Sequence, residues 1–178
     1  MSFGCLVDQH DRLLASSFGS NYQKVERHLV EYSKKTIGES LERSDHWLSH
    51  EMTRRFEGTK NPRSVKLNRD FVSTHQDRVC KVLEKIPTGR VTTYGLISKH
   101  IGSGPRAVGG AVASNPWSIF VPCHRVVPSS LTIGNYSLCG ALGEKGTVTK
   151  HDLLLREAVP INEDRIDLVA VWDPSEGV

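Results

Sequence analysis

The sequence lacks the features that would place it in a membrane, in a repetitive fibre or around a metal ion. No apolar stretch approaches the roughly 18 residues that a membrane helix needs, so no membrane partner is expected. No internal repeat or low-complexity segment is present. The four cysteines show neither a C-x-x-C pair nor the cysteine and histidine spacing of zinc sites. We therefore expect no metal site, and thiols kept reduced inside a cell.

Two further absences concern targeting and charge. The first residues, MSFGCLVDQHD, do not show the basic and then apolar pattern of a secretory signal. We therefore expect a cytoplasmic protein, or a nuclear one if the source is a eukaryote. The formal net charge is only +3 over 178 residues, a mild basic bias that is compatible with nucleic acid but does not by itself indicate it.

Hydrophobic patterns in the first half predict a small α/β unit. Residues 3–19 read as two short strands around a polar turn, and Ser20 opens a capping-box pattern before a helical repeat of apolar residues. A second helix is expected over residues 45–56. The turn-rich segment GTKNPRS (58–64) reads as a linker, so we expect a small α/β N-terminal domain over residues 1–66.

The second half predicts a mainly α-helical domain over residues 67–178 that contains a helix-turn-helix. Thr74 is the expected cap of its first helix. A short helix should follow, capped by Thr92 or Thr93, and Pro105 should open another after a Gly-containing loop. Two short helices joined by a tight turn are typical of a helix-turn-helix, and an ordinary helical hairpin gives the same pattern.

The last of these helices has an unusually bare surface. Its sequence RAVGGAVAS (106–114) contains a pair of glycines, and glycine inside a helix costs about 1 kcal/mol relative to alanine. Such a cost is expected where another surface approaches closely, either a second helix or the sugar-phosphate backbone of DNA. Arg106 in the first turn opposes the helix macrodipole and is placed to reach into DNA.

The stretch SIFVPCHRVVPSS places a thiol, an imidazole and a guanidinium side by side. Only a thiolate is a good nucleophile, so a cysteine with a pKa of about 8.5 needs a base to activate it. Cys123 and His124 would point to opposite faces of a strand, and they can cooperate only if the chain bends sharply or a water relays the proton. A carboxylate should orient the imidazole, and both Glu157 and Asp152 qualify. Alone, such a pair would more often be ordinary core.

Six segments in a fixed order change that assessment. They are IPTGRVTTYG, RAVGGAV, NP, PCHRV, GNYS and LLLRE. With them the chain resembles the O6-alkylguanine-DNA alkyltransferases, also called methylated-DNA–protein-cysteine methyltransferases, over residues 71–160. The resemblance implies a ribonuclease-H-like N-terminal domain, a winged-helix-like second domain, and no cofactor. It also implies a monomer that repairs double-stranded DNA containing O6-alkylguanine.

The resemblance also implies roles for individual residues. Cys123 would accept the alkyl group irreversibly, so that each molecule works once. His124 would take the thiol proton through a water, with Glu157 holding the imidazole. Asn115 would brace the turn between the recognition helix and the active-site loop. Tyr94 would contact the DNA, help to turn the nucleotide out and donate a proton to N3 of the leaving guanine.

Further positions would form the substrate pocket and the DNA surface. By the same resemblance, Ser137 would hydrogen-bond O6, Tyr136 would wall the pocket, and the carbonyl of Val126 would accept from the exocyclic amine. Arg106 would enter the base stack from the minor groove. The small residues of the recognition helix would lie against the DNA: Ala107, Gly109 and Gly110.

The sequence departs from the family pattern after GNYS. The run LCGALGEKGTVTK replaces a Gly-Gly pair and an early lysine, which affects the loop that limits the alkyl group accepted. Three other classes of protein fit the sequence less well. A lesion sensor related to the family would lack Cys123, and a helix-turn-helix regulator would carry a polar, base-reading face. A cysteine hydrolase would need an oxyanion hole, which no segment clearly supplies.

Overall fold

A computed structural model describes residues 1–38, 44–59, 61–134 and 150–176. The chain forms two compact units, and it visits the first of them more than once. Of the described residues, unit 1 holds those within Met1–Val72 and Pro116–Phe120, and unit 2 holds Ser73–Asn115 and those from Val121 onward. The division into domains 1–66 and 67–178 stays a prediction.

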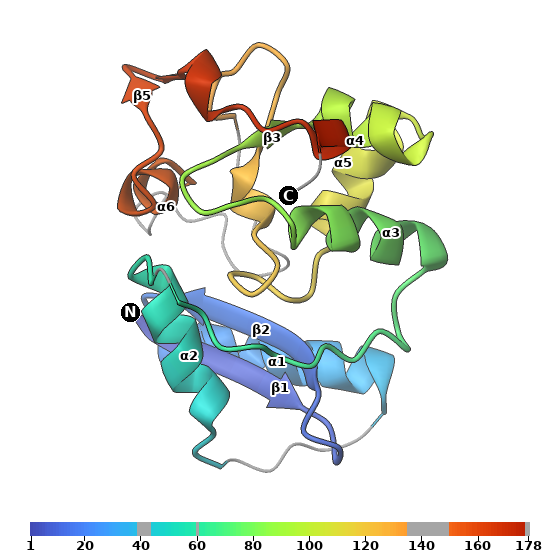
Figure 1. Ribbon diagram of the computed structural model, residues 1–178. Coiled ribbons are helices and arrows are strands. Elements are labelled where there is room, and N and C mark those ends of the chain that lie inside the picture. Colours follow the sequence, from blue (N-terminus) through green and yellow to red (C-terminus); the bar gives the residue numbers. More distant parts are fainter. Residues whose placement is uncertain (39–43, 60, 135–149, 177–178) are drawn as a thin grey trace. The chain divides into compact units, whose positions relative to one another are not determined.

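Unit 1 is built on an antiparallel pair of strands, β1 (Ser2–Val7) and β2 (Leu13–Gly19) (Figure 1). This is the pair predicted from residues 3–19. Two later segments join β2 through isolated parallel bridges, one between Leu13 and Leu67 and the other between Ser16 and Trp117. The strand β2 is buried along its whole length because it receives neighbours from both earlier and later parts of the chain.

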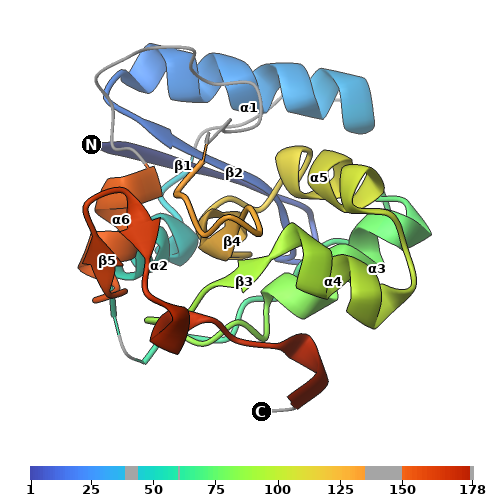
Figure 2. The same ribbon diagram turned by 90° about the horizontal axis from the view of Figure 1, so that it is seen from above.

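Two helices cover the two faces of this sheet, α1 (Tyr22–Thr36) and α2 (Trp47–Phe56) (Figure 2). Side chains alternate along β1, so Gly4 faces α1, where a Cβ would come within 2.7 Å of Leu29. The neighbouring Phe3 faces α2 and meets Phe56 edge-on at 5.2 Å between ring centroids. The cap of α1 is Asn21, one residue later than the predicted Ser20, because its side chain accepts a hydrogen bond from the Lys24 amide.

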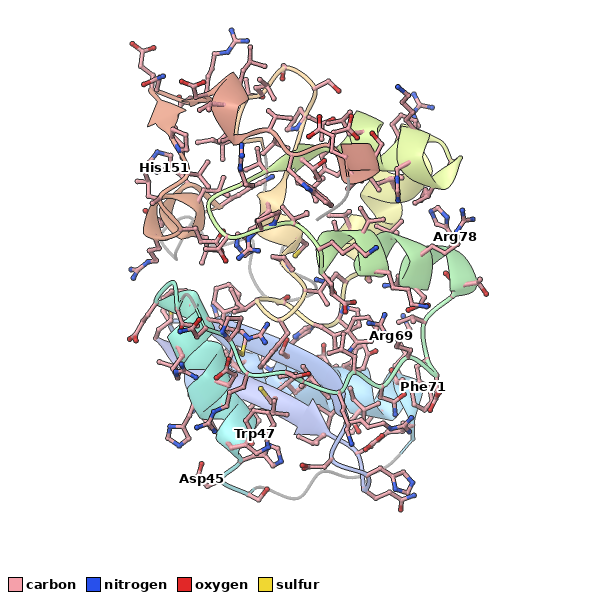
Figure 3. All side chains as sticks on the ribbon, in the orientation of Figure 1. Asp45, Trp47, Arg69, Phe71, Arg78 and His151 are labelled. Atoms are coloured by element: carbon pink, nitrogen blue, oxygen red, sulfur yellow. The ribbon has the colours of Figure 1, made fainter. Side chains whose placement is uncertain are left out.

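Unit 2 begins with three helices that pack on one another, α3 (Thr74–Leu83), α4 (Tyr94–Ile101) and α5 (Pro105–Ala113). Ser73 rather than Thr74 caps α3, and Thr93 caps α4. Gly102 ends α4 in a left-handed conformation with φ +64°, which glycine adopts without strain. Arg78 projects from α3 and donates to the Ile101 carbonyl at the end of α4 (Figure 3). The predicted pair of short helices is therefore present.

The rest of unit 2 consists of short elements around a second core. They are β3 (Thr92–Thr93), the 3₁₀ turn η1 (Cys123–Arg125), β4 (Val126–Val127), α6 (Lys150–Arg156), β5 (Ile161–Asn162), β6 (Arg165–Ile166), η2 (Leu168–Ala170) and η3 (Pro174–Glu176). β3 pairs in parallel with β4. The C-terminal segment, to which the sequence assigns no chemistry, contributes Ile166 and Ala170 to the core. None of the described helices is both long enough and apolar enough to cross a membrane.

Candidate functional site

The thiol lies in a sharp turn rather than in a strand. Cys123 and His124 belong to η1, where three residues complete a turn, so their side chains are not held on opposite sides as in a strand. The Cys123 amide donates to the Val121 carbonyl at 2.8 Å, and the Arg125 amide donates to the Pro122 carbonyl at 3.0 Å. The chain therefore bends sharply here, which is one of the two ways in which the pair was expected to cooperate, and the water relay stays a prediction.

Glu157 is the carboxylate that lies beside the imidazole. Its Oε1 is 2.9 Å from Nε2 of His124, and it follows directly after α6. Arg125 holds the same carboxylate from the other side, with Nε 2.7 Å from Oε2 and Nη2 2.8 Å from Oε1. Asp152, the alternative, lies in the first turn of α6, at the opposite end of the helix from Glu157. The side chains of His124 and Glu157 are almost fully buried, so this is a desolvated ionic cluster.

Burial and charge fix the protonation states of this cluster. Burial lowers the pKa of His124, although the hydrogen bond and the charge of Glu157 act to raise it. Burial acts to raise the pKa of Glu157, but hydrogen bonds and charges of His124 and Arg125 lower it to about 2. A neutral imidazole beside a carboxylate carries its proton on Nε2. Its Nδ1 is buried, has no hydrogen-bond partner among the described residues, and is thus available as a base.

Sequence reasoning assigned no role to two charged residues of this site. Arg125 donates to the Ile86 carbonyl at 2.6 Å besides clasping Glu157. Lys150 is buried, and its Nζ donates to the Val126 carbonyl at 2.5 Å. Burial lowers the pKa of Lys150 to about 8, while the charge of Cys123 acts to raise it. The available signal was weak, namely an arginine and a lysine next to apolar runs.

Two further predicted residues lie near the thiol. Tyr94 is half-buried at the start of α4, and its pKa is raised by burial and then by the charge of Cys123. Asn115 is buried, and its Nδ2 donates to the Val121 carbonyl at 3.0 Å. That carbonyl also receives the Cys123 amide, so Asn115 holds the backbone two residues before the thiol.

The outward surface of α5 is bare. Arg106, Ala107 and Gly110 are exposed, and Gly109 is partly exposed. A Cβ built on Gly109 or Gly110 would meet no atom within 4 Å. The sequence allowed two explanations for the glycine pair, a second helix or the DNA backbone. Close packing against another described helix does not account for it. Val108 faces inward and is fully buried.

The remaining predicted positions separate into two groups. Val126 is buried in β4, where its carbonyl already accepts from Lys150 and has a second lone pair. Tyr136 and Ser137, the predicted pocket residues, lie outside the described residues. Within the described ranges, no group of three histidine, cysteine or acidic side chains could hold a metal ion.

Comparisons with known proteins agree with the resemblance drawn from the sequence. Residues 74–159 match the family model described as "6-O-methylguanine DNA methyltransferase, DNA binding domain". A methylated-DNA–protein-cysteine methyltransferase of Saccharolobus islandicus is 42% identical over 85 residues, which are 48% of this chain and 51% of that protein. One of Thermococcus sibiricus is 52% identical over 54 residues, or 30% of each chain. The chain thus spans about half or less of the length of these curated relatives.

The similarity in structure extends over more of the chain. The crystal structure of an O6-methylguanine-DNA methyltransferase from Pyrococcus kodakaraensis superposes with a TM-score of 0.72 and 28% identity. The match covers 88% of this chain and 91% of that one, so it includes the first half, where sequence alone shows little resemblance. The resemblance to this family is therefore confirmed.

Proposed function

Since residues 74–159 match the model of the DNA-binding domain of the 6-O-methylguanine DNA methyltransferases, we propose that this protein repairs alkylated DNA. It transfers the alkyl group of O6-alkylguanine in double-stranded DNA to its own Cys123. The observation that carries the proposal is the buried arrangement around the thiol. His124 follows Cys123 in a tight turn, and Glu157 holds the imidazole so that Nδ1 is left as the base.

The transfer balances without a cofactor. The Cys123 thiol gives its proton to Nδ1 of His124 through a water. The sulfur attacks the alkyl carbon, so that an S–C bond forms while the C–O6 bond breaks and its electron pair passes to the purine. Tyr94 donates a proton to N3 of the leaving guanine and regains one from the imidazolium. In total, one proton has moved from the Cys123 thiol to the guanine, and the products are a thioether and guanine. A thioether does not hydrolyse back to the thiol under these conditions, so each molecule would act only once.

The nucleotide has to leave the duplex for this reaction. An alkyl carbon inside the stack is out of reach of a protein thiol, and extruding the nucleotide costs a few kcal/mol. Arg106 would fill the vacated position, and a minor-groove approach that bends the duplex would recover part of the cost. The exposed glycines of α5 support this part of the proposal, since their missing side chains let a sugar-phosphate backbone come close.

The proposal also includes the substrate pocket, the folds of the two domains, the oligomeric state and the cellular location. Tyr136 and Ser137 would line the pocket and bind O6, and the Val126 carbonyl would accept from the exocyclic amine. We also keep as proposals a ribonuclease-H-like fold for the first domain and a winged-helix-like fold for the second. The protein would act as a monomer in the cytoplasm, or in the nucleus of a eukaryote.

Intact mass spectrometry tests the proposal directly. The full chain is mixed with duplex DNA carrying one O6-methylguanine, and with undamaged DNA and a Cys123→Ser variant as controls. We expect the wild type alone to gain one methyl group, saturating at one equivalent per chain. No gain despite tight binding to the lesion would indicate a lesion sensor instead. No gain and no preference for the lesion would refute repair by this protein.

A further inference from the structure

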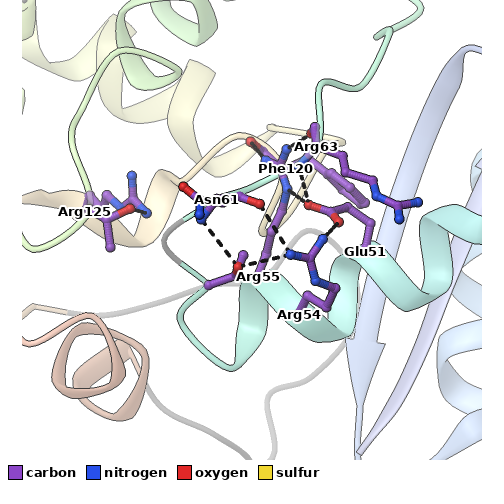
Figure 4. A network of polar contacts seen from close by, with 9 residues as sticks. Glu51, Arg54, Arg55, Asn61, Arg63, Phe120 and Arg125 are labelled. Atoms are coloured by element: carbon purple, nitrogen blue, oxygen red, sulfur yellow. Dashed lines mark hydrogen bonds and ion pairs between the residues drawn. The ribbon is translucent and has the colours of Figure 1, made fainter.

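A buried carboxylate in unit 1 organises a network that the proposed reaction does not use. The side chain of Glu51 in α2 is only 1% exposed. It accepts from Nη1 of Arg54 at 2.7 Å, from Nε of Arg55 at 3.2 Å and from the Arg63 amide at 2.8 Å (Figure 4). A buried charge is tolerated when it is paired and hydrogen-bonded in this way. The two arginines share this carboxylate but differ in what else they touch.

Arg55 connects the carboxylate to the segment that leads to the thiol. Its Nη1 donates to the Phe120 carbonyl at 3.3 Å, and its Nη2 donates to the Arg63 carbonyl at 2.6 Å. The guanidinium carbon also lies 5.0 Å from the centroid of the Phe120 ring. The planar fork of arginine can serve all these acceptors at once. Arg54 instead reaches Thr59 and the Asn61 carbonyl.

The segment before Phe120 is anchored at its other end as well. The Ser16 amide donates to the Pro116 carbonyl at 2.8 Å, and the Ser16 hydroxyl donates to the Ser118 carbonyl at 2.8 Å. Trp117 donates from Nε1 to the Leu13 carbonyl at 3.0 Å, and its ring lies beneath Arg69, which Figure 3 labels. Residues 116–118 are therefore fixed to β2.

Between the two anchors the backbone is in an unfavourable conformation. Ile119 has φ +72°, which a β-branched residue rarely adopts, and its side chain is buried. Such a conformation persists only where the surroundings impose it on both sides. Here the hydrogen bonds to the carbonyls of Ser118 and Phe120 restrain the backbone on the two sides of Ile119. Cys123 follows three residues after Phe120.

We propose that Arg55 is a positioning residue for alkyl transfer. By holding the carbonyl and the ring of Phe120, it maintains the backbone path from Ile119 to Cys123, while Glu51 orients Arg55. The inference rests on the proposed function, and Arg55 acts through Phe120 without touching the substrate. A displacement of about 1 Å at a reacting atom can cost about 100-fold in rate, so even partial release of Phe120 should be measurable.

The test compares Arg55→Met with Arg54→Met in the full chain. Both variants remove one cation from Glu51, and both should lower the thermal midpoint. Only Arg55→Met also frees Phe120. We expect about a tenfold lower single-turnover rate constant at saturating DNA for Arg55→Met, with the dissociation constant for lesion-containing DNA within twofold of wild type. Arg54→Met should transfer the methyl group at the wild-type rate. A general loss of stability would not lower the transfer rate in Arg55→Met alone while leaving its affinity for DNA unchanged.

Two results would overturn the inference. One is wild-type transfer by Arg55→Met, and the other is an equal loss of rate in both variants, which would assign the effect to the charge of Glu51. If Arg55→Met does not fold, Arg55→Gln, which is shorter and uncharged and therefore also releases Phe120, takes its place, and a wild-type rate in that variant would count equally against the inference. A wild type that gains no methyl group refutes the proposed function instead, so the two failures are distinguishable.

Discussion

The lowered pKa of Glu157 should be visible in the pH dependence of the protein's stability. Its pKa in the folded protein is about 2, against about 4.3 in an unfolded chain. A lowered pKa stabilises the fold above the unfolded value, and this contribution is lost as the pH falls from about 4.3 towards 2. The lowered pKa of buried His124 acts in the same direction, because below about pH 6.5 only the unfolded imidazole gains a proton.

We therefore expect Glu157→Gln to weaken the protein and to flatten its acid response. Removing one partner from a buried ionic cluster costs about 3–5 kcal/mol, since Arg125 and His124 keep their desolvation cost. Urea unfolding between pH 3 and 7 measures both effects. Glu163→Gln, which changes an exposed carboxylate in the same unit, is the control and should follow the wild-type curve below pH 5. Identical curves for the two variants would contradict the role of Glu157.

The contrast between Glu157 and Arg125 shows what single residues reveal in a sequence. The need for a carboxylate near His124 followed from chemistry, and two candidates were named. The choice between them depends on where α6 ends, which is a property of the packed unit. Besides holding Glu157, Arg125 donates to the Ile86 carbonyl, and Lys150 donates to the Val126 carbonyl. Every residue has a backbone carbonyl, and the sequence does not indicate which of them a side chain will reach. These contacts could therefore not be predicted.

At the scale of secondary-structure elements, α5 gives a prediction in which stability and function change in opposite directions. Replacing Gly110 by alanine should stabilise the fold by about 1 kcal/mol, since the position is inside a helix and a Cβ there meets no atom. If DNA approaches this surface, the same change should weaken DNA binding several-fold, and Gly110→Leu should weaken it by tenfold or more. Thermal unfolding and fluorescence anisotropy with lesion-containing duplex measure the two effects.

The comparison of Gly110→Ala with Gly110→Leu supplies the control for this prediction. A loss of affinity that grows from alanine to leucine, while both variants are at least as stable as the wild type, supports close approach of the DNA. Unchanged affinity for Gly110→Leu would place the DNA on another surface.

Elements with local signals were predicted well, and those that depend on distant partners were not. Local signals located the starts of α3 and α4 and the end of α4 to within one residue, because caps such as Thr93 and turn glycines such as Gly102 act on their own neighbours. The bend at Cys123–Arg125 was only one of two options. Its geometry depends on Asn115 and the Val121 carbonyl, whose contact is a feature of the folded loop.

At the scale of the whole molecule, the chain leaves unit 1 near Val72 and returns to it for residues 116–120 just before the thiol. Periodicity and turn residues cannot predict such a return, because the bridge between Ser16 and Trp117 joins residues far apart in the sequence. Cys123 in unit 2 therefore follows in the chain only three residues after Phe120, the last residue of that return to unit 1.

That organisation leads to a prediction about the spent protein. Cys123 is only 7% exposed, and its turn is held through Val121 by Asn115. An added methyl group must fit into packed surroundings, which costs about 1–3 kcal/mol, or about 2–10 °C in the first unfolding transition of a chain of this size. Scanning calorimetry of protein freed from DNA after stoichiometric methylation should show this decrease. Protein treated with undamaged DNA and the Cys123→Ser variant treated with lesion-containing DNA should not change. A methylated protein with an unchanged or higher midpoint would show that the turn has room for the thioether, and that methylation does not loosen the spent protein.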